Sequence, residues 1–325
     1  MLQFRNKTPF SGLIWLAPDP AGVESVYAVV KGTFSLAAGM QPAQTQMPVA
    51  VEDEYVGEPG RSSICVPSDI CLVKPGTDVL LLGHAYAPAG RRITSLDVGL
   101  RAGPVQAVLR VFGDRFWERD SFGVTISPPQ PFEQMPLVWE RAYGGTTQDE
   151  TEPRNPVGAG LSSETGARLP NLEDPRQLIG SPRDRPSPVN FAPTCAHWQP
   201  RRSYAGTYDE TWQRYRAPYL PADFDPRFFQ ISPPYLITPN YLQGGEPVEV
   251  VGAAPSAALQ FKVPQCVIRI TYRLDQGKEV RAAALDTLVI EPDAARVILV
   301  WRTALACDKL PLRVREVEAQ VLEAA

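Results

Sequence analysis

Three aspartates in the second half of the chain are the strongest candidates for catalysis. Asp223 and Asp225 stand two residues apart, and Asp209 precedes them. A glycoside hydrolase needs such carboxylates, because one donates a proton while the other acts as base or nucleophile. Pro221 and Pro226 enclose the pair, however, and this favours a turn in which the aspartates accept hydrogen bonds from backbone N–H groups. The sequence therefore favours a structural role and leaves a carbohydrate-binding or glycoside-hydrolysing function as the alternative.

The histidines and cysteines offer little for metal or nucleophilic chemistry. The chain has 2 histidines and 5 cysteines, and Cys195 stands close to His197. A metal site usually needs three or four ligands, and the sequence places no second cluster beside this pair. The glycines do not follow the spacing of a phosphate-binding loop. We therefore expect no metal site, no cofactor and no catalytic residue.

Charge and hydropathy narrow the choice of partners. The 325 residues include 32 basic and 36 acidic side chains, which give a formal net charge of −4. Electrostatic binding to nucleic acids or anionic membranes needs a basic excess, so we expect no direct contact with either. The first residues lack the apolar segment of a signal peptide, and no apolar run is long enough for a membrane-spanning helix. These features predict a soluble cytoplasmic protein.

Proline is abundant, with 34 residues, and long helices are therefore not expected. Short runs of β-branched, aromatic and aliphatic residues, bounded by Gly, Pro or Asp, indicate strands instead. These runs cover 26–36, 78–86, 93–100, 105–112, 258–261, 266–274, 279–283, 287–290 and 297–301. The tail 317–321 fits either an edge strand or a short helix. We predict an all-β fold in which two strand-rich flanks, 1–136 and 247–325, form one antiparallel, sandwich-like body.

The segment 137–246 joins the two flanks and is rich in proline, aromatic residues and arginine. Disordered segments are poor in aromatic residues, so this composition argues for an ordered, irregular excursion. Long loops inside a domain are often functional, and arginine is enriched at protein interfaces. We therefore treat 1–325 as a single domain whose function is carried by the 137–246 excursion.

Several motifs follow one another in this excursion. They occupy 139–145, 155–160, 169–173, 191–193, 206–209, 221–229 and 242–246. Together with the β-rich flanks, this order resembles the bacterial domain of unknown function 2169 family. The segment 179–187 departs from the pattern because it is rich in Arg and Pro, and it is a place where partner specificity could lie.

The resemblance implies a role in type VI secretion. Members of the family are expected to be non-catalytic adaptors or chaperones that bind protein effectors, often nuclease toxins. They are expected to load these effectors onto a spike that ends in a PAAR-type tip protein. Binding would use the aromatic loop surface or the addition of a strand at a sheet edge.

The motif residues that we expect to bind the partner or hold the motifs are Glu140, Arg141, Tyr143, Asn155, Trp198, Tyr208, Asp209, Trp212, Asp223 and Asp225. In this hypothesis Trp and Tyr act as anchors, while Arg and Asp orient hydrogen bonds. The alternative is that these residues shape the loops, with Glu140 and Arg141 forming an internal ion pair.

Overall fold

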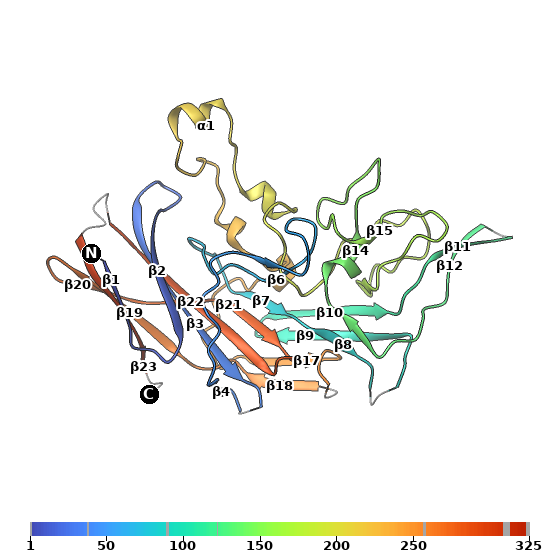
Figure 1. Cartoon of the computed structure of the whole chain (residues 1–325), viewed down its shortest axis with the longest axis horizontal. Coiled ribbons are helices and arrows are strands. Elements are labelled where there is room, and N and C mark those ends of the chain that lie inside the picture. The colour runs from blue at the N-terminus through green and yellow to red at the C-terminus, as the bar shows by residue number, and fades with distance from the viewer. Residues whose placement is uncertain are drawn as a thin grey trace.

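The computed structural model describes residues 2–37, 39–88, 91–121, 123–255, 258–307 and 313–322, and strands dominate among them (Figure 1). The largest sheet has, in spatial order, β2 (Ser11–Pro18), β3 (Glu24–Ser35), β22 (Arg296–Ala306), β21 (Ala284–Glu291) and β7 (Asp78–Leu81), with β4 (Gln41–Pro42) also paired to β3. We call it the six-stranded sheet. Its pairs are antiparallel except for β21 and β7, which run parallel.

Two further sheets complete the body. The five-stranded sheet has the order β16 (Leu172–Glu173), β10 (Val105–Phe112), β9 (Ser95–Ala102), β17 (Pro247–Val251) and β18 (Ala258–Lys262). The four-stranded sheet has the order β1 (Gln3–Asn6), β23 (Val314–Leu322), β19 (Val267–Leu274) and β20 (Lys278–Ala282). Short two-stranded pairs lie outside these sheets: β5 (Glu54–Tyr55) with β6 (Ile64–Val66), β8 (His84–Tyr86) with β13 (Gln134–Pro136), β11 (Trp117–Asp120) with β12 (Gly123–Ile126), and β14 (Tyr143–Gly144) with β15 (Ala159–Gly160).

Helical structure is scarce in the described residues. It consists of one α-helix, α1 (Glu210–Tyr215), and the short 3-10 turns η2 (Trp139–Arg141), η3 (Arg201–Tyr204), η4 (Pro226–Phe229) and η5 (Pro234–Leu236). The all-β prediction is therefore confirmed. Within the described part of the chain, no helix is long and apolar enough to cross a membrane.

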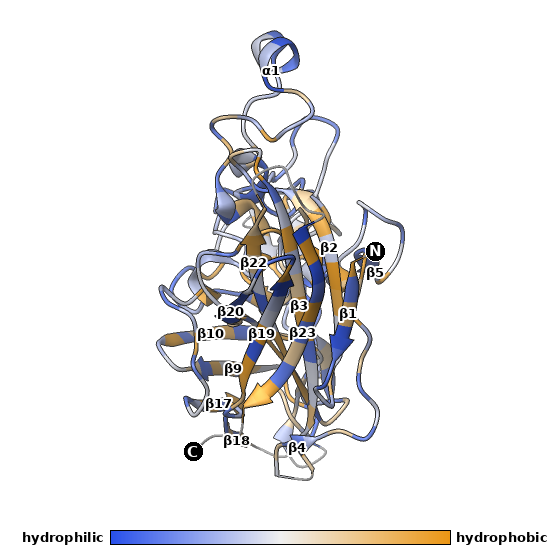
Figure 2. Ribbon diagram, turned by 90° about the vertical axis from the view of Figure 1, so that its left-hand side faces the viewer, coloured by the Kyte–Doolittle hydropathy of each residue, from blue (hydrophilic) through white to orange (hydrophobic). Residues whose placement is uncertain are grey.

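The sheets pack around one large core of buried apolar residues. Figure 2 colours the strands by hydropathy. Alternate residues of a strand point to opposite faces, so Val26, Ala28 and Val30 of β3 all point into this core. The same core contains Val98 of β9 and Ile270 of β19. The six-stranded sheet thus packs one face against both smaller sheets. The other face of β3 belongs to a second, smaller apolar cluster.

The two flanks of the chain pair with each other in all three sheets, and the 137–246 excursion adds β16 to the five-stranded sheet. The N-terminal β3 pairs with the C-terminal β22 from Ser35 and Arg296 to Ser25 and Ala306. In the same way β9 pairs with β17, and β1 pairs in parallel with β23. The predicted joining of the flanks is therefore confirmed.

Two local predictions differ from the structure. The run 78–86 is not one strand: β7 ends at Leu81, Gly83 adopts a φ of 143°, and β8 pairs with β13 outside the six-stranded sheet. The tail 317–321 is neither an edge strand nor a helix. It belongs to β23, which lies between β1 and β19 and buries Val317 and Ala319. Long-range pairing decides both cases, and local patterning does not contain that information.

Candidate functional site

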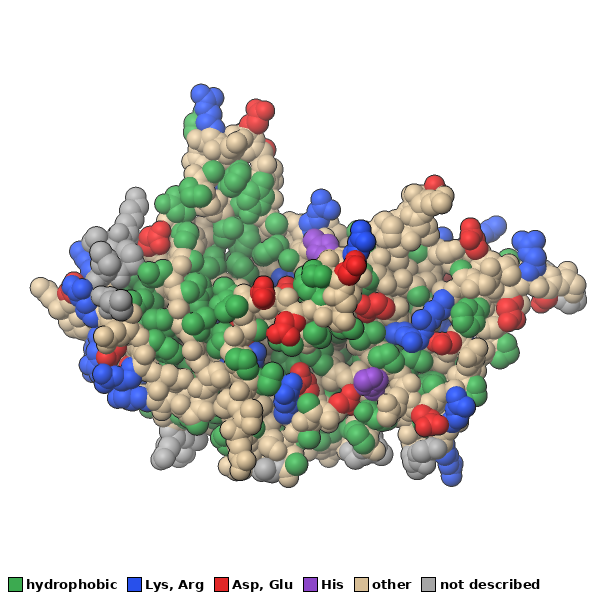
Figure 3. Space-filling model, viewed as in Figure 1, with side chains coloured by type: hydrophobic (Ala, Val, Ile, Leu, Met, Phe, Trp, Pro, Cys, Tyr) green, Lys and Arg blue, Asp and Glu red, His purple; other side chains and the backbone are tan. Residues whose placement is uncertain are grey.

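The segment 204–229 projects from the body with α1 near its far end, and we call it the arm (Figures 1 and 2). Hydrophobic side chains gather along the arm and at its base, and charged side chains lie at its tip (Figure 3). Its aromatic residues are Tyr204, Tyr208, Trp212, Tyr215, Tyr219, Phe224, Phe228 and Phe229. Helix α1 buries no residue, and Tyr208 and Tyr215 are 54% and 75% exposed. The arm therefore presents large apolar side chains to solvent.

Local contacts hold the far end of the arm together, since an isolated helix of six residues is not stable in water. The carboxylate of Asp209 caps α1 by accepting a hydrogen bond of 2.8 Å from the backbone N–H of Trp212. The indole N–H of Trp212 donates to the carbonyl oxygen of Tyr219 at 2.8 Å. The rings of Tyr208 and Trp212 lie edge to face, with centroids 4.7 Å apart. These contacts fix the aromatic side chains relative to one another.

The base of the arm is closed by a second aspartate. Asp223 accepts hydrogen bonds from the backbone N–H of Thr207 at 3.0 Å and from its hydroxyl at 2.8 Å, and so joins the two sides of the arm. Gly206, directly before Thr207, has a φ of 80°, and an added Cβ there would lie 2.8 Å from the Cβ of Pro221. Only glycine fits this close approach without strain.

The third aspartate stabilises the return to the body. Asp225 accepts from the backbone N–H of Arg227 at 2.9 Å and from its Nε at 2.8 Å. The guanidinium of Arg227 in turn lies over the ring of Tyr204, 4.4 Å from its centroid. Asp223 and Asp225 both accept backbone N–H groups, as the sequence predicted, although the donor to Asp223 is Thr207 on the other side of the arm and not a neighbour in its own turn.

The arm also rests on the body at the turn between β2 and β3. The guanidinium of Arg216 donates from Nη2 to the carbonyl oxygen of Pro20 at 2.6 Å and from Nε to that of Leu220 at 2.7 Å. The ring of Tyr219 lies against Gly22, where an added Cβ would be 3.4 Å away. These contacts connect the arm to the loop between β2 and β3.

We expect the arm to loosen in acid. Backbone and hydroxyl hydrogen bonds from Thr207 lower the pKa of Asp223, and hydrogen bonds from Arg227 lower the pKa of Asp225. A carboxyl with a lowered folded pKa contributes stability that is fully present above its unfolded pKa, about 3.9, and is lost as pH falls through the folded value. Pepsin digestion across a pH series should therefore cut within 204–229 at about pH 3 and below, while circular dichroism still reports a folded body. Arm cleavage that starts only together with global unfolding would contradict this.

Other motif residues lie in the interior and hold the loop layer. Tyr143, Asn155 and Trp198 are all buried. The side-chain amide of Asn155 donates to the carbonyl oxygens of Trp139 and Tyr143, both at 2.9 Å. Trp139 and Trp198 meet edge to face with centroids 5.9 Å apart. The expectation that Tyr143 and Trp198 anchor a partner is therefore wrong, because their rings are enclosed by the protein itself.

Glu140 and Arg141 have separate partners, so the expected ion pair between them does not form. The carboxylate of Glu140 accepts from the backbone N–H of Ser63 at 2.7 Å and from its hydroxyl at 2.6 Å. Arg141 points the other way and forms an ion pair of 2.8 Å with Asp114. Asp114 also pairs with Arg168 at 2.7 Å. The two neighbours thus tie the motif to two different loops.

Replacing Asn155 with alanine should destabilise the protein by about 1–3 kcal/mol. The change leaves the carbonyl oxygen of Tyr143 without this donor, whereas that of Trp139 keeps the backbone N–H of Ala142. A buried unpaired polar group carries the full cost of its desolvation. Urea unfolding followed by fluorescence measures the loss. Asn240→Ala is the matched control, because Asn240 is exposed and a change there should stay within about 0.5 kcal/mol. Equal effects of the two substitutions would refute the interior role of Asn155.

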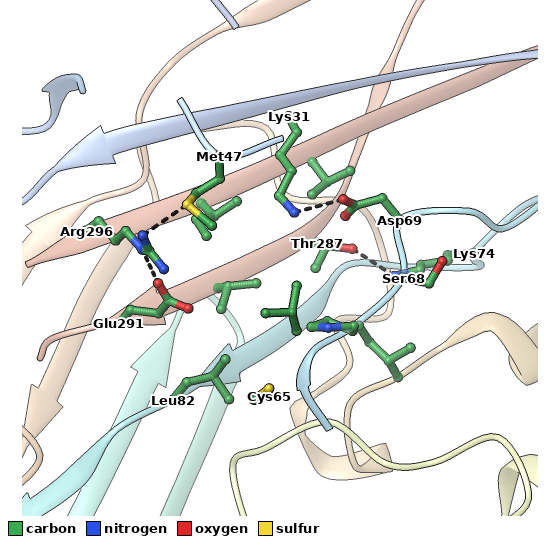
Figure 4. Close-up of a pocket in the computed structure, with 16 residues that line it drawn as sticks. Lys31, Met47, Cys65, Ser68, Asp69, Lys74, Leu82, Thr287, Glu291 and Arg296 are labelled. Carbon is green, nitrogen blue, oxygen red and sulfur yellow. Dashed lines mark hydrogen bonds and ion pairs between the residues drawn. The ribbon is translucent and has the colours of Figure 1, made fainter. Parts of the chain in front are cut away.

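Sequence reasoning missed a network of buried charges on the outer face of the six-stranded sheet. Lys74 and Asp78 are paired at 2.9 Å, with side chains only 3% and 0% exposed. Lys31 and Asp69 form a second buried pair at 2.8 Å. Figure 4 shows Lys31, Asp69 and Lys74 around one small cavity, where Lys74 also donates to Thr287 at 2.8 Å. The available signal was Lys31, a charged residue inside the apolar run 26–36.

This network binds the loop before β7 to the sheet rather than a ligand. Burial opposes the positive charge of Lys74, but the carboxylates of Asp78 and Asp286 outweigh it and raise the pKa of Lys74. The cavity measures about 30 Å³, far below the roughly 300 Å³ at which small-molecule pockets begin. No group of three or more His, Cys, Asp or Glu residues within the described ranges could hold a metal ion.

The comparison with family models identifies the chain. Residues 21–302 match the model of a family described as uncharacterized protein conserved in bacteria (DUF2169). The chain belongs to the DUF2169 family. The match includes the arm, the interior motif residues and most strands of the three sheets. No curated protein matches the chain, and no solved structure does. In this DUF2169 protein the motif residues therefore divide into an interior group and an arm group.

Proposed function

We propose that this DUF2169 protein is a non-catalytic adaptor of type VI secretion. In this proposal it binds a protein effector in the cytoplasm and helps to load it onto the spike that ends in a PAAR-type tip protein. The arm is the observation that carries the proposal. It exposes Tyr215 at the end of helix α1, which contributes nothing to the core, and Tyr208 just before that helix.

The construction of the arm suits protein binding. Tyrosine and tryptophan are enriched among the residues that dominate binding energy at interfaces. Fixing such side chains before binding reduces the entropy lost on association. The hydrogen bonds of Asp209, Asp223 and Trp212 provide this fixation. The three aspartates thus support binding indirectly, by holding the aromatic residues in place.

Co-expression tests the proposal. The genes next to this one are first searched for toxin-like and PAAR-like products. Any such products are then expressed with a tagged copy of this protein, and co-purification and the soluble yield of the toxin are measured. We expect a stable complex and a higher yield than without the adaptor. A toxin variant with its catalytic residue replaced should bind equally well, because an adaptor binds the surface of the toxin and does not need its enzymatic activity. If neither product binds, or if the tagged protein instead retains glycans, the adaptor function is refuted.

A further inference from the structure

A groove runs along part of the outer edge of the five-stranded sheet, beside β10. It measures about 650 Å³, within the range of roughly 300–1,000 Å³ that is typical of ligand pockets. One wall is the strand segment 106–109, and the other is formed by 174–177, 187–189 and Tyr235. None of these residues belongs to the arm, so the groove is a separate surface.

The pairing register shows which backbone groups face this groove. In an antiparallel pair, successive residues turn their N–H and C=O groups alternately toward and away from the partner strand. Phe112 donates from its backbone N–H to Asn171 at 2.8 Å, and Arg110 pairs with Glu173, so the even-numbered residues of β10 point away from β9. Gln106 and Val108 therefore direct their N–H and C=O groups toward the groove.

These groups are free to bind another strand. These N–H and C=O groups of Gln106 and Val108 point away from β9, and within the described ranges they have no hydrogen-bond partner on the groove side. Val108 is 42% exposed. An unpaired edge of this kind is a template for an added strand, because it offers donors and acceptors at the spacing of an extended chain.

The same edge already carries one strand of the protein itself. β16 pairs with Arg110 and Val111, and the chain then turns away at Asp174. The carboxylate of Asp174 stabilises this departure by accepting from the backbone N–H and the Nε of Arg176, at 2.9 and 3.0 Å. The groove begins where β16 ends, so an extended segment in it would continue the line of β16.

The chemistry of this edge distinguishes it from a protected one. Sheet edges are commonly guarded by charged residues, as β20 is by Lys278, Glu279 and Arg281. The segment 105–109 of β10 carries no charged residue. The Arg- and Pro-rich segment 179–187 reaches the opposite wall at Ser187.

We propose that the groove takes an extended segment of a partner protein, which adds to the five-stranded sheet as a strand beside β10. The segment would form backbone hydrogen bonds with Gln106 and Val108 and follow β16 along the edge. The proposal rests on the proposed function only in expecting that this segment belongs to the effector or the tip protein.

Short random peptides displayed on phage are the probe, selected on the whole protein. Val108→Pro removes the N–H that faces the groove, and an edge strand tolerates proline at such a position. We expect peptides selected on the native protein to bind this variant with an affinity lower by about tenfold or more. Val108→Thr keeps the N–H and should retain binding.

A proline on another free edge is the matched control. The backbone N–H of Asp19 donates to Val23, so by alternation Leu16 turns its N–H away from β3. Leu16→Pro should leave peptide binding unchanged. In the native protein, a selected peptide should also slow hydrogen exchange of the Gln106 and Val108 amides, a readout that does not depend on the folding of any variant.

Three results would overturn the proposal: selection yields no peptides, the peptides bind Val108→Pro as well as the native protein, or both amides exchange at unchanged rates. A dimer that Val108→Pro converts to a monomer would also refute it, because the occupant would then be a second copy of this chain. Peptide binding at the groove without co-purification of an effector would refute the adaptor function alone.

Discussion

Replacing Asp78 with alanine is expected to lower the free energy of unfolding by about 3–5 kcal/mol. The substitution leaves the charge of Lys74 buried without its carboxylate partner, and an unpaired buried charge is strongly destabilising. It also removes the acceptor of the backbone N–H groups of Ser232 and Ile231, at 2.9 and 3.2 Å. Urea denaturation at neutral pH, followed by circular dichroism, measures the effect.

Two controls test whether the loss of stability comes from burial of the ion pair or from the loss of any ion pair. Glu58→Ala breaks a pair with Arg61 whose side chains are 78% and 82% exposed, and it should cost less than about 0.5 kcal/mol. The double change Lys74→Met with Asp78→Leu removes both charges and should be less destabilising than Asp78→Ala alone. If Asp78→Ala has no larger effect than Glu58→Ala, the buried network does not stabilise the fold as described.

In the proposed adaptor function, replacing Tyr215 with alanine is expected to weaken the binding of the effector by roughly thirtyfold or more. Aromatic anchors at the centre of an interface often contribute about 2 kcal/mol or more on truncation to alanine, which corresponds to about thirtyfold in affinity. Tyr215 is 75% exposed, so the free protein should keep its stability. Tyr208→Ala should weaken binding as well, with a small effect on the arm because its ring packs on Trp212. Titration calorimetry with the purified effector measures the affinities.

The matched control is an exposed apolar residue on another surface. Val280 on β20 is 49% exposed, and Val280→Ser should leave the affinity unchanged. If Tyr215→Ala and Val280→Ser bind the effector equally well, the effector does not contact the arm. Co-purification with the native protein would then still support an adaptor, but one that uses a different surface.

The sequence by itself determined the fold class and the local roles of several residues. Runs of β-branched, aromatic and aliphatic residues between proline and glycine predicted the strands, because such residues favour the extended backbone and Pro and Gly interrupt it. Pro221 and Pro226 predicted that Asp223 and Asp225 would accept backbone hydrogen bonds. Asp225 accepts within its own turn, from Arg227, whereas Asp223 accepts from Thr207 on the other side of the arm. The strand runs and the turn at Asp225 depend on residues that are close together in the chain, so they can be read from the sequence.

Only the tertiary structure decided which aromatic residues face solvent. Tyr143 and Trp198 lie in motifs like that of Tyr208, yet the first two are buried and Tyr208 is exposed. Aromatic side chains suit cores and interfaces equally, so residue type does not separate the two. The pairing of Lys74 with Asp78 and the free edge of β10 likewise arise from contacts between distant segments. These contacts depend on the whole fold, so no local stretch of sequence predicts them.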